Sequence, residues 1–248
     1  MQDELLLRYS RHIFLPDFDV EGQEKLSYAR VLVVGAGGLG CPVGLYLAAS
    51  GVGNIVLADS DVVDTSNLQR QIGHASPDVG RLKVDSLADK MLRQNPAVCV
   101  TCIPERLMGQ SLLDAVAAVD LVVDGSDNFL TRQAVNAACV QLKKPLVSGA
   151  AIRYEGQVSV FCLTETSPCY ACLYGVDASA DDSSCSESGV LSPLVGMVGS
   201  VMAAEVVKII ASIGRPLDGR VLLCDIKNME WRFLNVSRDP GCAVCTEG

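Results

Sequence analysis

Apolar runs, each ending in a glycine or a polar residue, recur along the first 150 residues of the chain. The clearest is Arg30–Gly35, which is apolar throughout after its first residue and is typical of a central parallel strand. Similar runs predict further strands over Asn54–Asp59, Ala97–Ile103, Asp120–Asp124 and Pro145–Ser148. Between them, the pattern predicts helices over Gly38–Ser50, Arg81–Gln94 and Asn128–Gln141. This alternation predicts an α/β fold with a doubly wound, Rossmann-like and mostly parallel sheet.

The pattern changes after residue 150. Gln157–Phe161 alternates between polar and apolar residues, as an antiparallel strand does, and Arg220–Val236 predicts two closing strands. Val190–Ile213 predicts a long buried helix, and the segment before it, rich in Ser, Asp and Ala, predicts a surface loop. We find no internal repeat and no linker long enough to separate domains. The simplest interpretation is a single domain with an antiparallel C-terminal extension.

Charge and composition exclude several classes of function. The net charge is −9 and the longest basic run is Lys143–Lys144, which argues against nucleic acid or an anionic membrane as the main partner. The apolar stretch from Val190 to Ala204 is shorter than the roughly 20 residues that cross a bilayer. The acidic N-terminus is no secretory signal, and 11 cysteines without one indicate a reducing compartment. We therefore expect a cytoplasmic protein.

Two Cys-x-x-Cys pairs lie far apart in the second half of the chain. Four thiolates from two such pairs match a tetrahedral structural zinc site, and the alternative is four ordinary buried thiols. A third pair, Cys99 and Cys102, lies in a predicted strand, where this spacing sends the side chains to opposite faces and argues against a chelate. The predicted zinc ligands are Cys169, Cys172, Cys242 and Cys245.

A glycine-rich turn follows the first predicted strand. Gly35, Gly37 and Gly40 form a Gly-x-Gly-x-x-Gly pattern, which lets a phosphate approach backbone N–H groups at the start of a helix. Asp59 lies about 20 residues beyond the turn, where an acid commonly binds a ribose. On these residues alone, an NAD-dependent oxidoreductase stays open. Such an enzyme commonly uses His as acid or base, but both histidines, His12 and His74, lie outside the predicted strands.

Polar side chains of another kind follow the later strands. Ser66–Arg70, Lys83 and Ser126–Asn128 come after strands whose carboxyl ends line the binding crevice of an open α/β sheet. Two cations and an acid suit a triphosphate with magnesium better than a nicotinamide. The alternatives are solvated surface charges for Arg70 and Lys83, and the N-cap of the next helix for Asp127. Cys185 lies in the polar loop, where a thiol forms a thioester or persulfide or is an unreactive surface cysteine.

Taken in order, these residues resemble the MoeB/ThiF/HesA family of adenylyltransferases, which are relatives of ubiquitin-activating enzymes. The resemblance is strongest to members that act in molybdopterin synthesis, and the thiamine-pathway members share much of it. It spans nearly the whole chain. The segments that match the family are Arg8–Arg11, Gly35–Gly40, Asp59, Ser66–Arg70, Lys83, Asp127–Asn128, Ser148–Ala150 and both cysteine pairs. The closer likeness to the molybdopterin members lies in Gly22–Glu24, Ser66–Gln71 and Gly149–Gln157.

The resemblance implies ATP as substrate, with Mg²⁺ and a structural Zn²⁺. Asp59 would hold the ribose, and Gly38, with its neighbours, would let the nucleotide lie close to the backbone. Asn67, Arg70 and Lys83 would bind the phosphates, and Asp127 would hold Mg²⁺. The implied nucleotide-binding set is completed by Gly35, Gly37, Gly40, Ser66, Gln69 and Asn128.

The family's substrate is the C-terminal carboxylate of a ubiquitin-like sulfur-carrier protein that ends in Gly-Gly. The resemblance implies that Arg11 reaches into the site of a second subunit, so we expect a homodimer. It divides the chain into a helical arm (1–28), a nucleotide-binding part (29–150) and a carrier-binding zinc part (151–248). Because the chain stops shortly after Cys245, without a rhodanese-like domain, we expect a separate persulfide donor, such as a cysteine desulfurase or a rhodanese. A non-catalytic scaffold is the remaining alternative.

Overall fold

A computed structural model describes residues 3–176 and 188–246, and its centre is one sheet of eight strands. The strand order is β3-β2-β1-β4-β5-β6-β7-β8. The first five strands in this order run parallel and the last three pair antiparallel. The strands are β1 (Arg30–Val34), β2 (Asn54–Ala58), β3 (Cys99–Ile103), β4 (Leu121–Asp124), β5 (Leu146–Ile152), β6 (Glu155–Phe161), β7 (Arg220–Asp225) and β8 (Glu230–Asn235).

The parallel part of the sheet reverses its order between β1 and β4. The chain moves outward from β1 to β2 and β3, returns across the sheet to β4, and continues to β5. Val31 pairs with Leu121 and Val34 with Asp124, so both strands end at the same level. The crevice beyond the carboxyl ends of two such strands is where open α/β sheets bind ligands.

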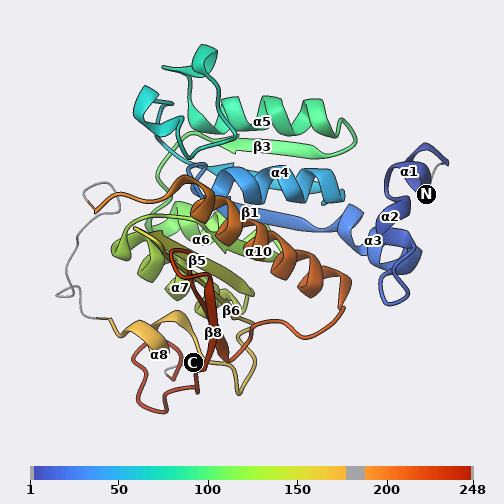
Figure 1. Ribbon diagram of the computed structural model, residues 1–248. Coiled ribbons are helices and arrows are strands. Elements are labelled where there is room, and N and C mark those ends of the chain that lie inside the picture. Colours follow the sequence, from blue (N-terminus) through green and yellow to red (C-terminus); the bar gives the residue numbers. More distant parts are fainter. Residues whose placement is uncertain (1–2, 177–187, 247–248) are drawn as a thin grey trace.

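Helices cover both faces of the sheet (Figure 1). One face packs against α4, α5 and α10, and its core contains Val31, Val33 and Leu47. The other face packs against α6 and α7, around Leu32, Val122 and Leu146. The helices are α1 (Asp3–Arg8), α2 (Ser10–Ile13), α3 (Asp19–Tyr28), α4 (Gly40–Ser50), α5 (Lys83–Gln94), α6 (Gly109–Ala117), α7 (Phe129–Leu142), α8 (Tyr170–Tyr174) and α10 (Ser192–Ala211), with short 3₁₀ turns η1 (Thr65–Asn67) and η2 (Ser76–Asp78).

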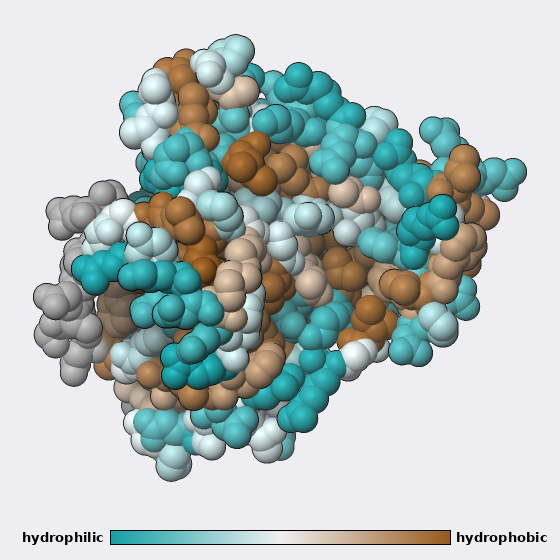
Figure 2. Space-filling view, in the orientation of Figure 1, coloured by the Kyte–Doolittle hydropathy of each residue, from teal (hydrophilic) through white to brown (hydrophobic). Residues whose placement is uncertain are grey.

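Helix α10 is the one described helix that is long and apolar enough to span a bilayer by length and composition. In the fold it packs against α4, β5 and β6, and Leu194, Val198 and Met202 lie in the main core. Figure 2 shows hydrophobic residues (brown) among paler ones across the middle of the face where α10 lies in Figure 1. The helix therefore serves as a core helix with one partly exposed side.

The predicted α/β fold is confirmed, with the parallel sheet and the antiparallel C-terminal strands in the expected places. Two differences have physical causes. The strand expected at Pro145–Ser148 continues to Ile152, because β6 pairs with it along that length. Helix α6 was not predicted, because its short amphipathic segment lies between two stronger strand patterns.

Candidate active site and metal centre

A cavity of about 340 Å³ lies at the carboxyl ends of the parallel strands. It is bounded by the glycine turn after β1, the ends of β2 and β4, and the start of α5. Many of the predicted nucleotide-binding residues line it together: Gly35, Gly37, Gly38, Asp59, Arg70, Lys83, Asp127 and Asn128. The topology thus brings together residues that are dispersed over nearly 100 positions of the chain.

The glycine turn is tight enough to require glycine at two places. Gly35 has a φ of +93°, a conformation that side-chain-bearing residues rarely adopt. A Cβ atom on Gly40 would lie 1.8 Å from the Gly35 carbonyl oxygen, which no side chain can occupy. At Gly37 the nearest atom would be Gln71 Nε2 at 3.5 Å, an ordinary contact. Gly35 and Gly40 therefore shape the turn, whereas a side chain at Gly37 would only contact Gln71 beside the cavity.

Asp59 fixes the turn to the loop after β2. One carboxylate oxygen accepts the Ala36 N–H at 2.7 Å, and the other accepts the Asp61 N–H at 2.8 Å. Each oxygen keeps a further lone pair, because a carboxylate accepts about four hydrogen bonds. The carboxylate is thus held in one orientation at the cavity and keeps the capacity to accept hydroxyl groups of a ligand.

The two predicted cations reach the cavity from different elements. Lys83 begins α5, and its Nζ lies 2.7 Å from Asp61 Oδ2. The Lys83 side chain is only 8% exposed, whereas that of Asp61 is 65% exposed. Arg70 follows η1, and its guanidinium donates to the Ser66 carbonyl oxygen at 3.1 Å. Lys83 is therefore a mostly buried cation that faces the cavity, which argues against a solvated surface charge.

The N-cap of α7 is Asn128 rather than Asp127. The Asn128 side chain accepts the Thr131 N–H at 2.9 Å and a hydrogen bond from Arg106 at 3.2 Å. This removes the alternative in which Asp127 only caps the helix. Asp127 lines the cavity and is exposed, so its oxygens are accessible to a cation. A carboxylate beside a phosphate site is a ligand that Mg²⁺ prefers.

Four further charged residues line the cavity and were not singled out from the sequence: Asp61, Glu105, Arg106 and Arg132. Glu105 and Arg106 follow the carboxyl end of β3, so the strand-end rule would have found them. Arg132 lies one turn into α7 and donates to the Ser126 carbonyl oxygen at 2.7 Å. Its place becomes visible only when the helix is oriented on the sheet.

Asp124 lies fully buried at the end of β4, directly behind the cavity. Burial raises the pKa of the Asp124 carboxyl, and the nearby Arg132 acts in the opposite direction. One oxygen accepts the Ser126 N–H at 2.9 Å. The other oxygen and the Ser126 hydroxyl are buried, and neither has a hydrogen-bond partner among the described residues. At the rim of the cavity, the second Asp124 oxygen and the Ser126 hydroxyl are therefore available to hydrogen-bond a ligand.

Several predicted residues lie outside the cavity lining. Gly40 lies beneath the turn, and the Asn67 side chain accepts the Asp64 N–H within η1. Ser66 and Gln69 use backbone carbonyl oxygens, which accept from Arg70 and from the Ser192 hydroxyl. Arg11 is exposed on α2. Helix α2 lies beyond the amino-terminal end of β1, next to α3 (Figure 1). Cys185 lies outside the described residues. The roles of these residues stay predictions.

The four predicted zinc ligands converge at the start of α8 and the C-terminal segment. The Sγ atoms lie 3.7 Å apart for Cys169 and Cys242, 3.8 Å for Cys169 and Cys172, and 3.5 Å for Cys172 and Cys245. All four ligand atoms lie within 4.8 Å of one another. Tetrahedral zinc with Zn–S bonds of about 2.3 Å separates its sulfur ligands by about 3.8 Å. The cluster can therefore hold a metal ion, and the residues fit zinc.

N–H groups of Asn136 and Asp239 donate to sulfur atoms of this cluster. Asn136, fully buried on α7, donates from Nδ2 to Cys169 Sγ at 3.7 Å and accepts the Tyr170 N–H at 2.9 Å. The Asp239 N–H points to Cys172 Sγ at 3.5 Å. Such contacts stabilise metal-bound thiolates and orient them. By contrast, Cys99 is exposed and Cys102 donates to the Val84 carbonyl oxygen, so this pair does not join the cluster.

Comparisons with known proteins agree with this geometry. The profile of the ThiF family matches residues 9–244. The chain belongs to the ThiF family. The molybdopterin-synthase adenylyltransferase of Salmonella typhimurium is 45% identical over 248 residues, which cover 99% of this chain and 98% of that protein. The sulfur carrier protein ThiS adenylyltransferase of Escherichia coli is 42% identical over 245 residues, covering 99% of this chain and 97% of that protein.

A solved structure extends the likeness to three dimensions. Escherichia coli MccB, crystallised with AMPCPP and MccA, superposes with a TM-score of 0.85 at 27% identity. The match covers 96% of this chain and 74% of that chain. The family resemblance expected from the sequence is confirmed, and the fold is similar to that of MccB.

Proposed function

We propose that this chain is an ATP-dependent adenylyltransferase that activates the C-terminal carboxylate of a ubiquitin-like sulfur-carrier protein ending in Gly-Gly, in the cytoplasm and for molybdopterin synthesis. The observation that carries the proposal is the convergence of Arg70, Lys83 and Asp127 on one cavity beside the glycine turn. The names of the relatives point the same way, since the two reported above are adenylyltransferases of sulfur-carrier systems. They also disfavour the NAD-dependent alternative.

The reaction needs little acid–base chemistry. The carrier's carboxylate is already ionised at pH 7, and one of its oxygens attacks the α-phosphorus of ATP while the bond to pyrophosphate breaks. The obstacle is repulsion between anions and the alignment of the reacting atoms. Fixed cations and exact positioning overcome both, which fits a site rich in charged residues whose one buried histidine does not line the cavity.

Each residue has a proposed task in this step. The free lone pairs of Asp59 bind the ribose, and Gly37 and Gly38, which line the cavity without side chains, let the nucleotide lie close to the backbone. Lys83 exchanges its partner Asp61 for phosphate oxygens, and Arg70 turns from the Ser66 carbonyl to the same phosphates. A Mg²⁺ ion held by Asp127 would offset charge on the triphosphate and on the departing pyrophosphate.

A second cavity supports a protein tail as the other substrate. It has a volume of about 270 Å³, is lined by β5–β8, and shares Ala151 with the nucleotide cavity. On β8, Trp231, Phe233 and Leu234 are exposed hydrophobic residues at the free edge of the sheet. We propose that the carrier docks on this part, within residues 151–248, and that its C-terminal tail passes along the second cavity to the first.

The place of Arg11 supports a homodimer. Helix α2 lies near the amino-terminal end of β1, and the cavity lies at the carboxyl end of the same strand (Figure 1). Arg11 is therefore remote from the cavity of its own chain, so a phosphate-binding role requires a second copy. The same arm exposes Leu7 at 77% and Phe14 at 71%, which a subunit interface would cover.

We further propose that the cysteine cluster binds one structural Zn²⁺ and that residues 1–248 act as one adenylation domain. Four cysteine ligands leave no open coordination position, so the metal stabilises the fold and takes no part in the reaction. The acyl-adenylate would then be attacked by sulfur from a persulfide donor, a cysteine desulfurase or a rhodanese. This displaces AMP and forms an acyl disulfide with the donor. A second thiol would then attack the donor's sulfur, forming a disulfide with it and releasing the carrier thiocarboxylate.

ATP–pyrophosphate exchange in the presence of Gly-Gly-ended carriers tests the proposal. We expect exchange with the wild-type chain, and a loss of about 100-fold or more for Asp127→Ala, in line with the removal of an electrostatic stabiliser. Asp114→Ala, which removes an exposed acid on α6, is the matched control and should keep wild-type exchange. If no Gly-Gly carrier supports exchange, the proposed function is wrong.

Mixing two inactive variants tests the homodimer. Asp127→Ala and Arg11→Ala should each exchange poorly as homodimers. If Arg11 serves the partner's cavity, a mixed dimer contains one cavity that lacks neither side chain, so the mixture should regain up to about one quarter of wild-type exchange after subunit mixing. A mixture that stays as inactive as its components would contradict the intersubunit role.

The ThiS carrier of the thiamine pathway is a second candidate substrate, favoured by the 42% identical relative that acts on it. The exchange assay separates the two, because the preferred carrier should give the higher kcat/KM.

A further inference from the structure

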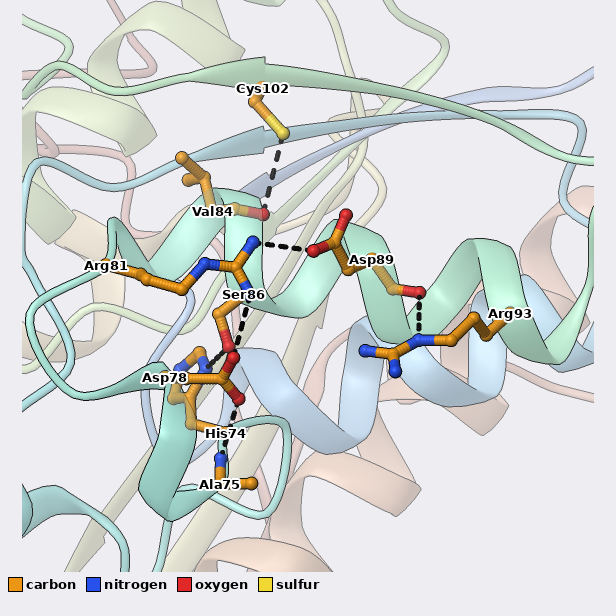
Figure 3. A network of polar contacts seen from close by, with 9 residues as sticks. All are labelled: His74, Ala75, Asp78, Arg81, Val84, Ser86, Asp89, Arg93 and Cys102. Atoms are coloured by element: carbon orange, nitrogen blue, oxygen red, sulfur yellow. Dashed lines mark hydrogen bonds and ion pairs between the residues drawn. The ribbon is translucent and has the colours of Figure 1, made fainter.

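His74 is a buried histidine for which the proposed mechanism has no task. It is 5% exposed and does not line the nucleotide cavity. Its ring contacts the glycine turn at Ala36 and the first turns of α5 at Ser86. Figure 3 shows His74 and Ser86 side by side. A polar ring in such a place is tolerated when its nitrogens are paired, so its partners indicate what it does.

Both ring nitrogens have partners. Nε2 lies 3.0 Å from the Ala36 carbonyl oxygen, and Nδ1 lies 2.9 Å from the Ser86 hydroxyl. A carbonyl oxygen only accepts, so Nε2 donates its proton and Nδ1 accepts from Ser86. Burial lowers the pKa of His74, which keeps the ring neutral at pH 7 in this tautomer.

The Ala36 peptide is thereby held at both polar atoms. Asp59 accepts its N–H at 2.7 Å, and His74 donates to its carbonyl oxygen at 3.0 Å, where the Cys41 thiol is a second and weaker donor at 3.4 Å. Ala36 is fully buried, so water does not replace either partner. Ala36 lies between Gly35 and Gly37, and these two bonds therefore fix the conformation of the phosphate-binding turn.

The same ring reaches the elements that carry both cations. Ser86 lies one turn after Lys83 on α5, and both residues are buried. The backbone N–H of His74 donates to the carbonyl oxygen of Gln71 at 3.0 Å, and Gln71 is the residue after Arg70. The ring therefore contacts the turn and α5 at once and belongs to the loop that presents Arg70.

We propose that His74 is a positioning residue of the nucleotide site: by bonding Ala36 and Ser86 together, it fixes the glycine turn against the start of α5 and so places Lys83 at the phosphates. This inference rests on the proposed function for the identity of the nucleotide. His74 itself transfers no proton and contacts no substrate.

A double-mutant cycle with Lys83, read by calorimetric titration with ATP and Mg²⁺, tests this role without a carrier protein. His74→Phe keeps an aromatic ring and removes both hydrogen bonds, and we expect it to lower ATP affinity about tenfold, as a small misplacement of binding groups does. Lys83→Ala alone should lower ATP affinity about tenfold. When it is added to His74→Phe, it should lower ATP affinity by less than about threefold, because Lys83 is then already misplaced.

Rescue by a conservative variant separates positioning from bulk stability. The His74→Gln amide can donate to the Ala36 carbonyl oxygen, so it should recover most of the affinity lost in His74→Phe. If His74→Phe does not fold, as judged by its urea transition and secondary-structure spectrum, Ser86→Ala replaces it in the cycle. That change cuts only the link to α5 and should show the same non-additivity with Lys83→Ala.

The outcomes distinguish this inference from the proposed function. Full ATP affinity in His74→Phe, or additive losses with Lys83→Ala, would overturn the positioning role while the wild type still binds ATP. If the wild type binds ATP but shows no exchange with any Gly-Gly carrier, the proposed function is wrong. The double-mutant cycle would then still test whether His74 positions Lys83, because it measures ATP binding alone. A wild type that binds no ATP would overturn both.

Discussion

The two halves of the sheet carry sites that are built in opposite ways. On the parallel half, Lys83 pairs with a mostly exposed acid, and the Ser126 hydroxyl has no hydrogen-bond partner among the described residues. Both groups are fixed in place and can still form a hydrogen bond or ion pair with a ligand. On the antiparallel half, four sulfur atoms already lie at tetrahedral separations. The first arrangement fits the proposed substrate site, which must bind and release its ligand, and the second fits the proposed closed site for a structural ion.

Helix α7 connects the two sites. Asn128 caps its first turn at the nucleotide cavity, and Asn136, about 12 Å further along the helix axis, contacts Cys169. A change at one end can therefore be compared with a change at the other on the same element. The comparison predicts that damage to the cysteine cluster lowers stability first, whereas damage to the cavity lowers ATP use first.

The largest effect on stability is expected from Cys242→Ser combined with Cys245→Ser. These residues join the C-terminal segment to the start of α8, 73 positions earlier in the chain, so their loss removes the ion and the cross-link together. We expect about one zinc per chain in the wild type by elemental analysis, none in the variant, and a free energy of unfolding lower by several kcal/mol. Full metal content in the variant would show that the ligands are misassigned.

The corresponding change on the parallel half is Gly40→Ala. A methyl group there would lie 1.8 Å from the Gly35 carbonyl oxygen, so the turn must open, at a cost of about 3 kcal/mol in unfolding free energy. Gly37→Ala is the matched control, because its Cβ would meet only Gln71 Nε2 at 3.5 Å. We expect that control to fold normally in urea titrations and to bind ATP less well. Equal stability of the two variants would contradict this division of roles.

The sequence predicted the elements of the sheet because buried parallel strands have a strong apolar signature. Arg30–Val34 and Leu121–Asp124 lie where the apolar runs placed them. It also predicted some of the residues that line the cavity, such as Asp59, Lys83 and Asp127, because the carboxyl ends of parallel strands share one edge of the sheet. The two cysteine pairs met as predicted, since their spacing is itself the signature of a chelate.

What the sequence left out depends on packing between distant segments. Arg132 and Asn136 lie in a helix with no motif, and their targets are set by how α7 packs against the sheet. His74 was noted only as lying outside the strands, although its ring fixes the glycine turn. Each acts through a hydrogen bond to a segment that the sequence did single out, but the pairing is set by tertiary packing and not by spacing along the chain.

A smaller effect is expected from Asn136→Asp, which probes the antiparallel site without removing a ligand. The new carboxylate can still accept the Tyr170 N–H, but it replaces the N–H that donates to Cys169 with an oxygen that repels the thiolate. Zinc affinity, measured by competition with a chelator, should fall about 10- to 100-fold. Gln141→Glu, the same amide-to-acid change at an exposed position of α7, should leave it unaltered. Equal losses in both variants would indicate a general effect of charge on the helix.

The smallest effect concerns the ion pairs that fasten η2 to α5 beside the nucleotide cavity. Arg81 bridges Asp78 at 2.8 Å and Asp89 at 2.6 Å, and the Ala75 N–H donates to Asp78 at 2.9 Å (Figure 3). Burial opposes ionisation of Asp78, but the hydrogen bonds from Ala75 and Arg81 outweigh it and hold the pKa of that carboxyl below its ordinary value.

A carboxyl with a lowered pKa stabilises the fold above its unfolded pKa, and this contribution disappears as the pH falls through the folded value. Asp78→Asn should therefore lower the urea midpoint slightly at pH 7, and the difference from the wild type should shrink toward pH 3. An exposed ion pair contributes little, so the change should stay far below that of the cysteine variant. If the difference in urea midpoint between wild type and Asp78→Asn grew as the pH fell, the hydrogen bonds from Ala75 and Arg81 would not be the interactions through which Asp78 stabilises the fold.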